Sequence, residues 1–190
     1  MTNASGTTKQ TIVALVADRP GVLNRIASMF RRRNFNIESL AVGHSEQPDL
    51  SRMTFVVNTA PGSAEQVTKQ LRKLIDVVKV SDITDEPMVA REMALIKVKT
   101  TPATRSEIIQ FVEIFRADIV DVSPDSLVIE ITGDEDKIDA LVRLMRPFGL
   151  KEIMRTGRVA MPRGSASATA EDQDEELRYR ANGGKPDGEK

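Results

Sequence analysis

The first half of the chain alternates between a strand pattern and a helix pattern. Thr11 to Ala17 is a β-branched, apolar run of the kind expected for a buried central strand. Pro20 then suits the first position of a helix, where a missing N–H costs nothing. Apolar side chains follow at helical spacing and predict one amphipathic helix, which ends in Arg31-Arg32-Arg33. They are Val22, Leu23, Ile26, Met29 and Phe30.

Two strands, a second helix and a closing strand complete this set. Phe35 to Val42 and Met53 to Asn58 are expected to pair as a hairpin. A second helix follows Pro61-Gly62, and Val77 to Ile83 forms the last strand. The inward side chains of that helix are expected to be Val67, Leu71, Leu74 and Ile75. This order is that of a ferredoxin-like unit, whose strand order 4-1-3-2 leaves the second strand at an edge.

The same order of elements returns after Asp85-Glu86-Pro87, where a domain boundary is plausible. The tight turn Ser123-Pro124-Asp125-Ser126 separates its two middle strands. The predicted strands are Ala94 to Lys99, Ile119 to Val122, Leu127 to Thr132 and Leu150 to Met154. The predicted helices carry Ile108, Phe111, Val112 and Phe115, and, from about Asp134 onward, Ile138, Leu141, Val142 and Met145. The predicted fold class is therefore α+β, with two tandem ferredoxin-like βαββαβ domains.

The domain limits follow from these elements. We expect a flexible N-terminus at residues 1–10, a first domain at 11–84, a linker at 85–93 and a second domain at 94–163. Residues 164–190 are rich in Gly, Ser, Ala and charged side chains. Such a tail cannot bury enough apolar surface to offset its chain entropy, so we expect it to be disordered.

Composition narrows the function. Lys plus Arg (27) and Asp plus Glu (28) nearly cancel, so no long-range field attracts nucleic acid or a membrane surface. Cysteine is absent, which excludes disulfides and thiol nucleophiles, and the polar segment Met1 to Gln10 lacks the apolar core of a signal peptide. We expect a cytoplasmic protein. His44 is the single histidine and reads as a loop or strand-end residue, so we predict neither a metal site nor any catalytic residue.

One candidate binding site stands out, at Asp18-Arg19-Pro20-Gly21 and Asn36. The amides at a helix N-terminus attract a carboxylate, and Gly21 has no Cβ to block its approach. Asp18 can accept a hydrogen bond from an ammonium group, and Asn36 can both donate and accept. These groups suit a free α-amino acid. Apolar Val22, Leu23 and Ile37 would favour a small aliphatic side chain.

A structural reading competes with this one, because aspartate before a helix is often a cap and Pro-Gly is common at helix starts. The second predicted strand favours the binding site over the structural reading, because an edge strand has unpaired hydrogen-bonding groups that a second protomer can pair with. Pairing of two such edges in a dimer would place Asn36 and Ile37 of one protomer near the turn from Asp18 to Gly21 of the other.

The stretch from Asp18 to Leu40, continued by Ser51-Arg52-Met53-Thr54 and by Leu74 to Ser81, resembles the amino-terminal ACT domain of the regulatory (small) subunit of acetolactate synthase. The similarity runs from about Thr11 to about Arg163 and includes Glu113 to Val122 in the second domain.

The resemblance implies a subunit that activates a separate catalytic (large) subunit carrying thiamine diphosphate, Mg²⁺ and FAD. Pairing of the edge strands predicts that this subunit is a homodimer through its ACT domain. The resemblance also implies feedback inhibition by valine, or by leucine or isoleucine. Some relatives have asparagine at Asp18, which changes the charge at that position. By position, the resemblance implies backbone contacts from Gly21 and Val22, and a lining from Asn36 and Ile37 of the partner protomer. Together with the residues singled out above, the predicted effector-binding set is Asp18, Pro20, Gly21, Val22, Leu23, Asn36 and Ile37. An alternative is a free-standing ACT-domain sensor that controls transcription, although the chain lacks a helix-turn-helix segment and a basic face.

Overall fold

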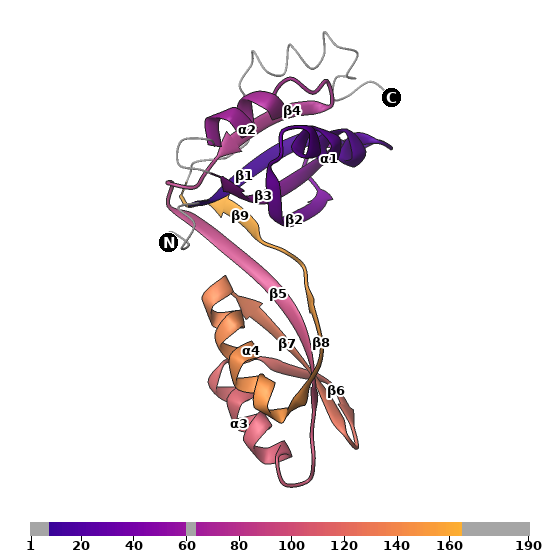
Figure 1. Cartoon of the computed structure of the whole chain (residues 1–190), viewed down its shortest axis with the longest axis vertical. Coiled ribbons are helices and arrows are strands. Elements are labelled where there is room, and N and C mark those ends of the chain that lie inside the picture. The colour runs from indigo at the N-terminus through magenta and orange to yellow at the C-terminus, as the bar shows by residue number, and fades with distance from the viewer. Residues whose placement is uncertain (1–7, 60–63, 165–190) are drawn as a thin grey trace. The chain divides into compact units, whose positions relative to one another are not determined.

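The computed structural model describes residues 8–59 and 64–164. The chain forms two compact units (Figure 1). The first unit contains the described residues up to Val89 and those from Ala160 onward, and the second unit contains Ala90 to Val159. Each unit has its own buried apolar cluster.

The first unit is an antiparallel sheet with two helices. Its elements are β1 (Thr8–Ala17), α1 (Val22–Arg32), β2 (Asn36–His44), β3 (Leu50–Thr59), α2 (Ala64–Leu71) and β4 (Val77–Asp82). The strand order is β2-β3-β1-β4, which confirms the predicted order and places β2 at an edge. α1 is a helix because its apolar residues recur every three or four positions and leave the charged residues outside.

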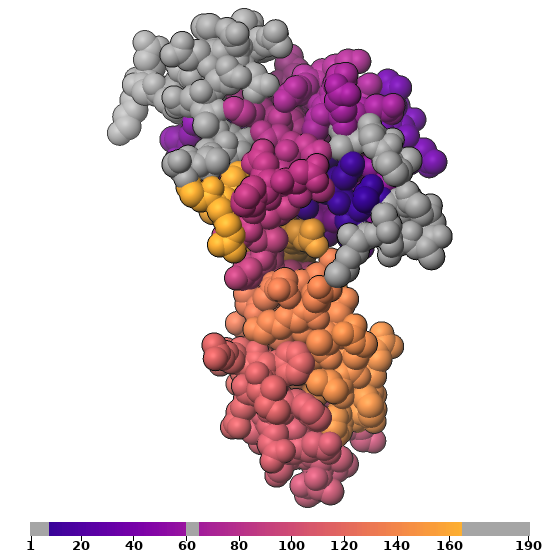
Figure 2. Space-filling model, turned by 90° about the vertical axis from the view of Figure 1, so that its left-hand side faces the viewer, coloured from indigo at the N-terminus to yellow at the C-terminus, as the bar shows by residue number. Residues whose placement is uncertain are grey.

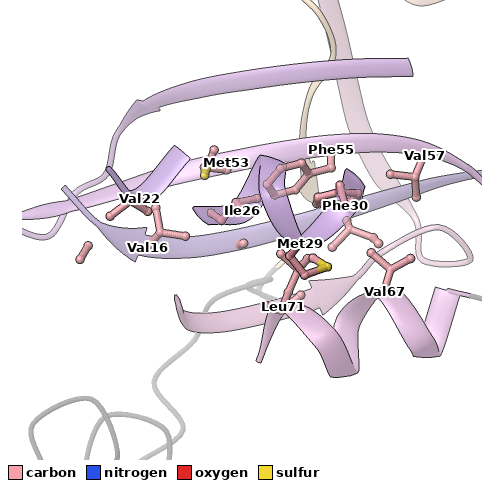
Figure 3. Close-up of a cluster of buried hydrophobic side chains, with 14 residues drawn as sticks. Val16, Val22, Ile26, Met29, Phe30, Met53, Phe55, Val57, Val67 and Leu71 are labelled. Atoms are coloured by element: carbon pink, nitrogen blue, oxygen red, sulfur yellow. The ribbon is translucent and has the colours of Figure 1, made fainter. Parts of the chain in front are cut away.

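Both helices pack on one face of that sheet, because alternate residues of β1 and β3 belong to the same buried cluster as the apolar stripe of each helix. Figure 3 shows Ile26 and Phe30 of α1 against Phe55 of β3, with Val67 and Leu71 of α2 beside them. The Phe30 and Phe55 rings stack with centroids 5.3 Å apart. This core fixes the start of α1 against the end of β1, which is where the candidate site lies.

The second unit repeats the arrangement. Its elements are β5 (Met88–Lys99), α3 (Arg105–Ile114), β6 (Asp118–Ser123), β7 (Ser126–Gly133), α4 (Glu135–Gly149) and β8 (Leu150–Arg155). A last strand, β9 (Val159–Pro162), belongs to the first unit from Ala160 onward, as does β5 up to Val89. The sheet order is β6-β7-β5-β8, and β9 also pairs with β5. α3 and α4 lie side by side on the face seen in Figure 2. Asp134 caps α4 by accepting a hydrogen bond from the Lys137 amide at 2.9 Å.

The fold matches the predicted α+β class, but several boundaries differ. β5 begins at Met88, so part of the predicted linker is strand, and β9 was not predicted. Pro20 lies in a turn rather than at the first helical position, because Gly21 after it is left-handed at φ 89°. Residues 8–10 belong to β1 and not to a flexible terminus.

The inward position predicted for Ile75 is wrong. α2 ends at Leu71, and the chain then turns, with the Leu74 amide bonded to the Leu71 carbonyl. Ile75 therefore leaves the helical face and is half exposed, whereas Leu74 still packs against the core. The predicted helix start at Pro61-Gly62 and residues 165–190 of the predicted tail lie outside the described residues.

No helix in the described ranges has both the length and the apolar character needed to cross a bilayer.

Candidate functional site

The turn between β1 and α1 leaves the start of the helix open. Gly21 is the N-cap, so no side chain caps α1, and its first turn contains no acidic residue. The Arg25 amide donates to the Gly21 carbonyl at 3.0 Å. Within the part of the chain that the structure describes, the amides of Leu23 and Asn24, which precede Arg25, have no hydrogen-bond partner. These amides and the helix dipole favour an anion at this point.

Space above the turn is also open. A Cβ added to Gly21 would meet no atom within 4 Å. Asp18, Arg19 and Pro20, which precede Gly21, are exposed. The space around Gly21 is therefore wide enough for the close approach of a ligand that we expected from the sequence.

Asp18 is engaged by the one histidine of the chain. Its Oδ2 lies 2.9 Å from Nδ1 of His44, the last residue of β2, and its amide donates to the Asp49 carbonyl at 2.7 Å. His44 does end a strand, as expected, but its contact with Asp18 was not predicted. An ammonium group that bound Asp18 would share this carboxylate with the imidazole.

Asn36 opens β2 and is exposed. It lies directly opposite Asn58 of β3, so both carboxamides are on one face of the sheet. Among the described residues, Oδ1 of Asn58 is the buried side-chain oxygen without a hydrogen-bond partner.

The apolar candidates divide into two kinds. The side chain of Val22 is 4% exposed and belongs to the core, so Val22 can offer a ligand only its backbone. Leu23 is 49% exposed beside the turn. Ile37 is partly buried against the core at the start of β2.

Within one chain, the two halves of the candidate site lie at opposite ends of β2. Asp18 contacts His44 at the end of the strand, whereas Asn36 is its first residue. At the usual strand rise, Asn36 and His44 are about 26 Å apart. One chain therefore does not bring its own turn and its own Asn36 together.

Comparison with known families decides the family. The family described as "Small subunit of acetolactate synthase" matches residues 91–164, and the "AHAS small subunit-like ACT domain" matches residues 12–79. The chain belongs to the acetolactate synthase small-subunit family. The resemblance inferred from the turn, β2 and the second domain is thereby confirmed.

Individual relatives agree with this family. The chain is 58% identical over 157 residues to the probable acetolactate synthase small subunit of Archaeoglobus fulgidus, covering 83% of this chain and 98% of that one. It is 52% identical over 158 residues to the small subunit of Bacillus subtilis, covering 83% and 92% of the two chains. The crystal structure of the Thermotoga maritima small subunit superposes with a TM-score of 0.78 at 43% identity, over 84% of this chain and 99% of that one.

The residues that the structure describes contain no group of three or more histidine, aspartate or glutamate side chains placed to hold a metal ion.

Proposed function

We propose that this chain is the non-catalytic regulatory subunit of acetolactate synthase. It raises the activity of a separate catalytic subunit and confers feedback inhibition by valine, or by leucine or isoleucine. Membership of the small-subunit family supports the partnership, and the open start of α1 supports the effector site. Thiamine diphosphate, Mg²⁺ and FAD belong to the catalytic partner in this proposal, and the cytoplasm is its location.

The proposed effector is held as a zwitterion. Its carboxylate meets the amides at the start of α1, from Gly21 to Asn24, where no side chain competes for them. Its ammonium group meets the Asp18 carboxylate and a carboxamide oxygen of Asn36. Exposed Leu23 favours an aliphatic side chain over a polar one.

We place this site between two protomers. β2 is an edge strand, and an antiparallel pair of β2 strands puts the start of one beside the end of the other. Asn36 of one protomer then lies near His44 and Asp18 of its partner. The separation of about 26 Å between Asn36 and His44 within one chain supports this arrangement, because a single protomer does not bring both parts of the site together.

In this proposal, regulation arises because valine binding is thermodynamically linked to the arrangement of the dimer. Valine that contacts two protomers binds one arrangement of the dimer better than another, and the catalytic subunit responds to that difference in affinity. No catalytic group is required of this chain.

The test is valine inhibition of the reconstituted enzyme with Asn36→Ala. Activation by the variant should be retained, because Asn36 is exposed. Loss of a hydrogen bond to a charged ligand costs about 1.5–3 kcal/mol, so the half-inhibitory valine concentration should rise at least about tenfold.

Gln110→Ala is the matched control, because it removes an exposed carboxamide from α3 in the second unit. It should leave inhibition unchanged. Unaltered inhibition of Asn36→Ala would contradict the proposed site. Capture of DNA rather than a thiamine-diphosphate enzyme from cell extract would contradict the partnership.

A further inference from the structure

Asp76 is the buried charged residue among those that the structure describes. Its side chain is 1% exposed, and it directly precedes β4. Burial disfavours an unpaired carboxylate strongly, so a buried aspartate needs cationic partners. The identity of those partners shows what the residue does.

Both partners come from the segment that carries the proposed effector site. Nε of Arg19, in the turn between β1 and α1, donates to Oδ1 of Asp76 at 2.8 Å, and Nη2 of Arg19 donates to the same oxygen. Nη1 of Arg25, in the first turn of α1, donates to Oδ2. The Ala17 amide also donates to the Asp76 carbonyl at 2.8 Å. Asp76 is thus tied to residues before, within and after the turn.

The ends of the turn are also held by the backbone, since the Asp18 amide donates to the Asp49 carbonyl at 2.7 Å and the Arg25 amide donates to the Gly21 carbonyl at 3.0 Å. Arg19, Pro20 and Gly21 are exposed, and Gly21 has no side chain to pack. The Val22 amide lies 3.4 Å from the Arg19 carbonyl, which is long for a hydrogen bond. Between these two ends, the contacts of Arg19 with Asp76 tie the exposed part of the turn to the residue before β4.

We propose that Asp76 is a positioning residue that holds the turn in the conformation that receives the effector. This inference rests on the function proposed above and names a control over that site. Asp76 does not touch the effector, because two guanidinium groups cover its buried carboxylate. It acts through Arg19. Without Asp76, only a fraction of the molecules have the turn in the conformation that points the amides at the start of α1 toward the effector. The apparent affinity for valine is then reduced by that fraction.

The experiment compares valine inhibition of the reconstituted enzyme and calorimetric binding of valine to the full chain. Asp76→Asn and Arg19→Gln should each raise the half-inhibitory concentration and the Kd at least about tenfold. The double variant should show no larger change than Asp76→Asn alone, because Asp76→Asn already removes the ion pair with Arg19. Arg19→Lys, which keeps the charge but loses the planar fork, should restore part of the affinity.

Glu65→Gln is the matched control. Glu65 pairs with Lys69 on α2 at 2.6 Å in an exposed ion pair of the same unit, so its loss removes the same kind of charge. It should change the valine response less than twofold. Thermal unfolding of each variant separates loss of the fold from loss of affinity.

Each outcome has a distinct meaning. If Asp76→Asn does not fold, Arg19→Gln carries the test, because Arg19 is half exposed and Arg25 still pairs with Asp76. If Arg19→Gln weakens valine binding but folded Asp76→Asn does not, Arg19 acts without Asp76 and the inference is overturned. If both folded variants bind valine normally, the positioning role is overturned and the proposed function stands. If the wild type responds to none of valine, leucine and isoleucine, the proposed function fails and this inference fails with it.

Discussion

The two units begin their first helices differently. In the first unit, Gly21 precedes α1 and no acidic residue follows in the first helical turn. In the second unit, Thr104 precedes α3, and Glu107 lies in the first helical turn. Thr101 and Thr104 also bond to each other, with the Thr101 amide donating to Oγ1 of Thr104 at 3.0 Å.

This difference concerns the electrostatics of the two helix starts. A first-turn carboxylate already complements the dipole of α3, whereas α1 has no such group of its own. The arginine side chains near the two helix starts also have different hydrogen-bond partners. Arg105 donates to the carbonyls of Ser123 and Pro124 at 2.8 Å, and Arg19 pairs with the carboxylate of Asp76. A repeated architecture therefore does not imply a repeated site.

The largest expected stability change in this comparison comes from Gly21→Ala. An L-residue at φ 89° is strained even in open space, so the free energy of unfolding should fall by about 1–2 kcal/mol. Chemical denaturation measures it. Gly43→Ala is the control, because Gly43 has equal space and no positive φ. Equal effects of the two substitutions would show that the turn does not need its left-handed residue.

Asn24→Glu makes α1 resemble α3, because Asn24 and Glu107 are each the third residue of their helix. The new carboxylate should stabilise the first unit by about 0.3–1 kcal/mol and compete with the effector carboxylate. Valine inhibition should therefore weaken at least about tenfold while thermal stability rises. The reciprocal Glu107→Asn should lose similar stability and leave inhibition intact. Retained inhibition of Asn24→Glu would place the effector elsewhere.

Mixed dimers sharpen this result. A dimer of one Asn24→Glu protomer and one Asn36→Ala protomer combines both defects in one site and leaves the other intact, if each site spans two protomers. Such a dimer should recover half of the high-affinity valine sites, measured by calorimetry. If each site lay within one protomer, neither site would be intact and no recovery would be seen.

The smallest expected effect concerns Glu92 of the second unit. Burial raises the pKa of Glu92 above its usual 4.5, and Glu135 and Asp139 add to the rise against the opposing effect of Arg155. A raised pKa in the folded state means that stability falls as pH increases from 4.5 through that pKa.

Glu92→Gln should therefore unfold at a slightly higher temperature than the wild type at pH 7, and the gain should vanish below pH 4.5. Glu65→Gln in the first unit should show the opposite sign, because its hydrogen bond with Lys69 lowers the pKa of Glu65. A Glu92→Gln gain that did not depend on pH would contradict this account.

Periodicity and turn chemistry were sufficient to predict the α+β fold and the strand order, but they placed Pro20 at the first helical position and missed the left-handed N-cap at Gly21. The same rules missed β9, because a four-residue strand that ends in Pro162 carries too little pattern. They also missed the contacts of Asp18 with His44 and of Arg19 with Asp76. The latter pair is separated by 57 residues, and local patterns do not encode such distances.

The central claim is that a branched-chain amino acid binds the start of α1, which has no acidic residue in its first turn, and not the start of α3, where Glu107 already complements the helix dipole. Nuclear magnetic resonance of backbone amides during a valine titration tests it most directly. The amide signals of Leu23 and Asn24 should shift and saturate, while those of Ser106 and Glu107 stay unchanged. Signals at α1 that do not move, or that move no more than those at α3, would contradict the account.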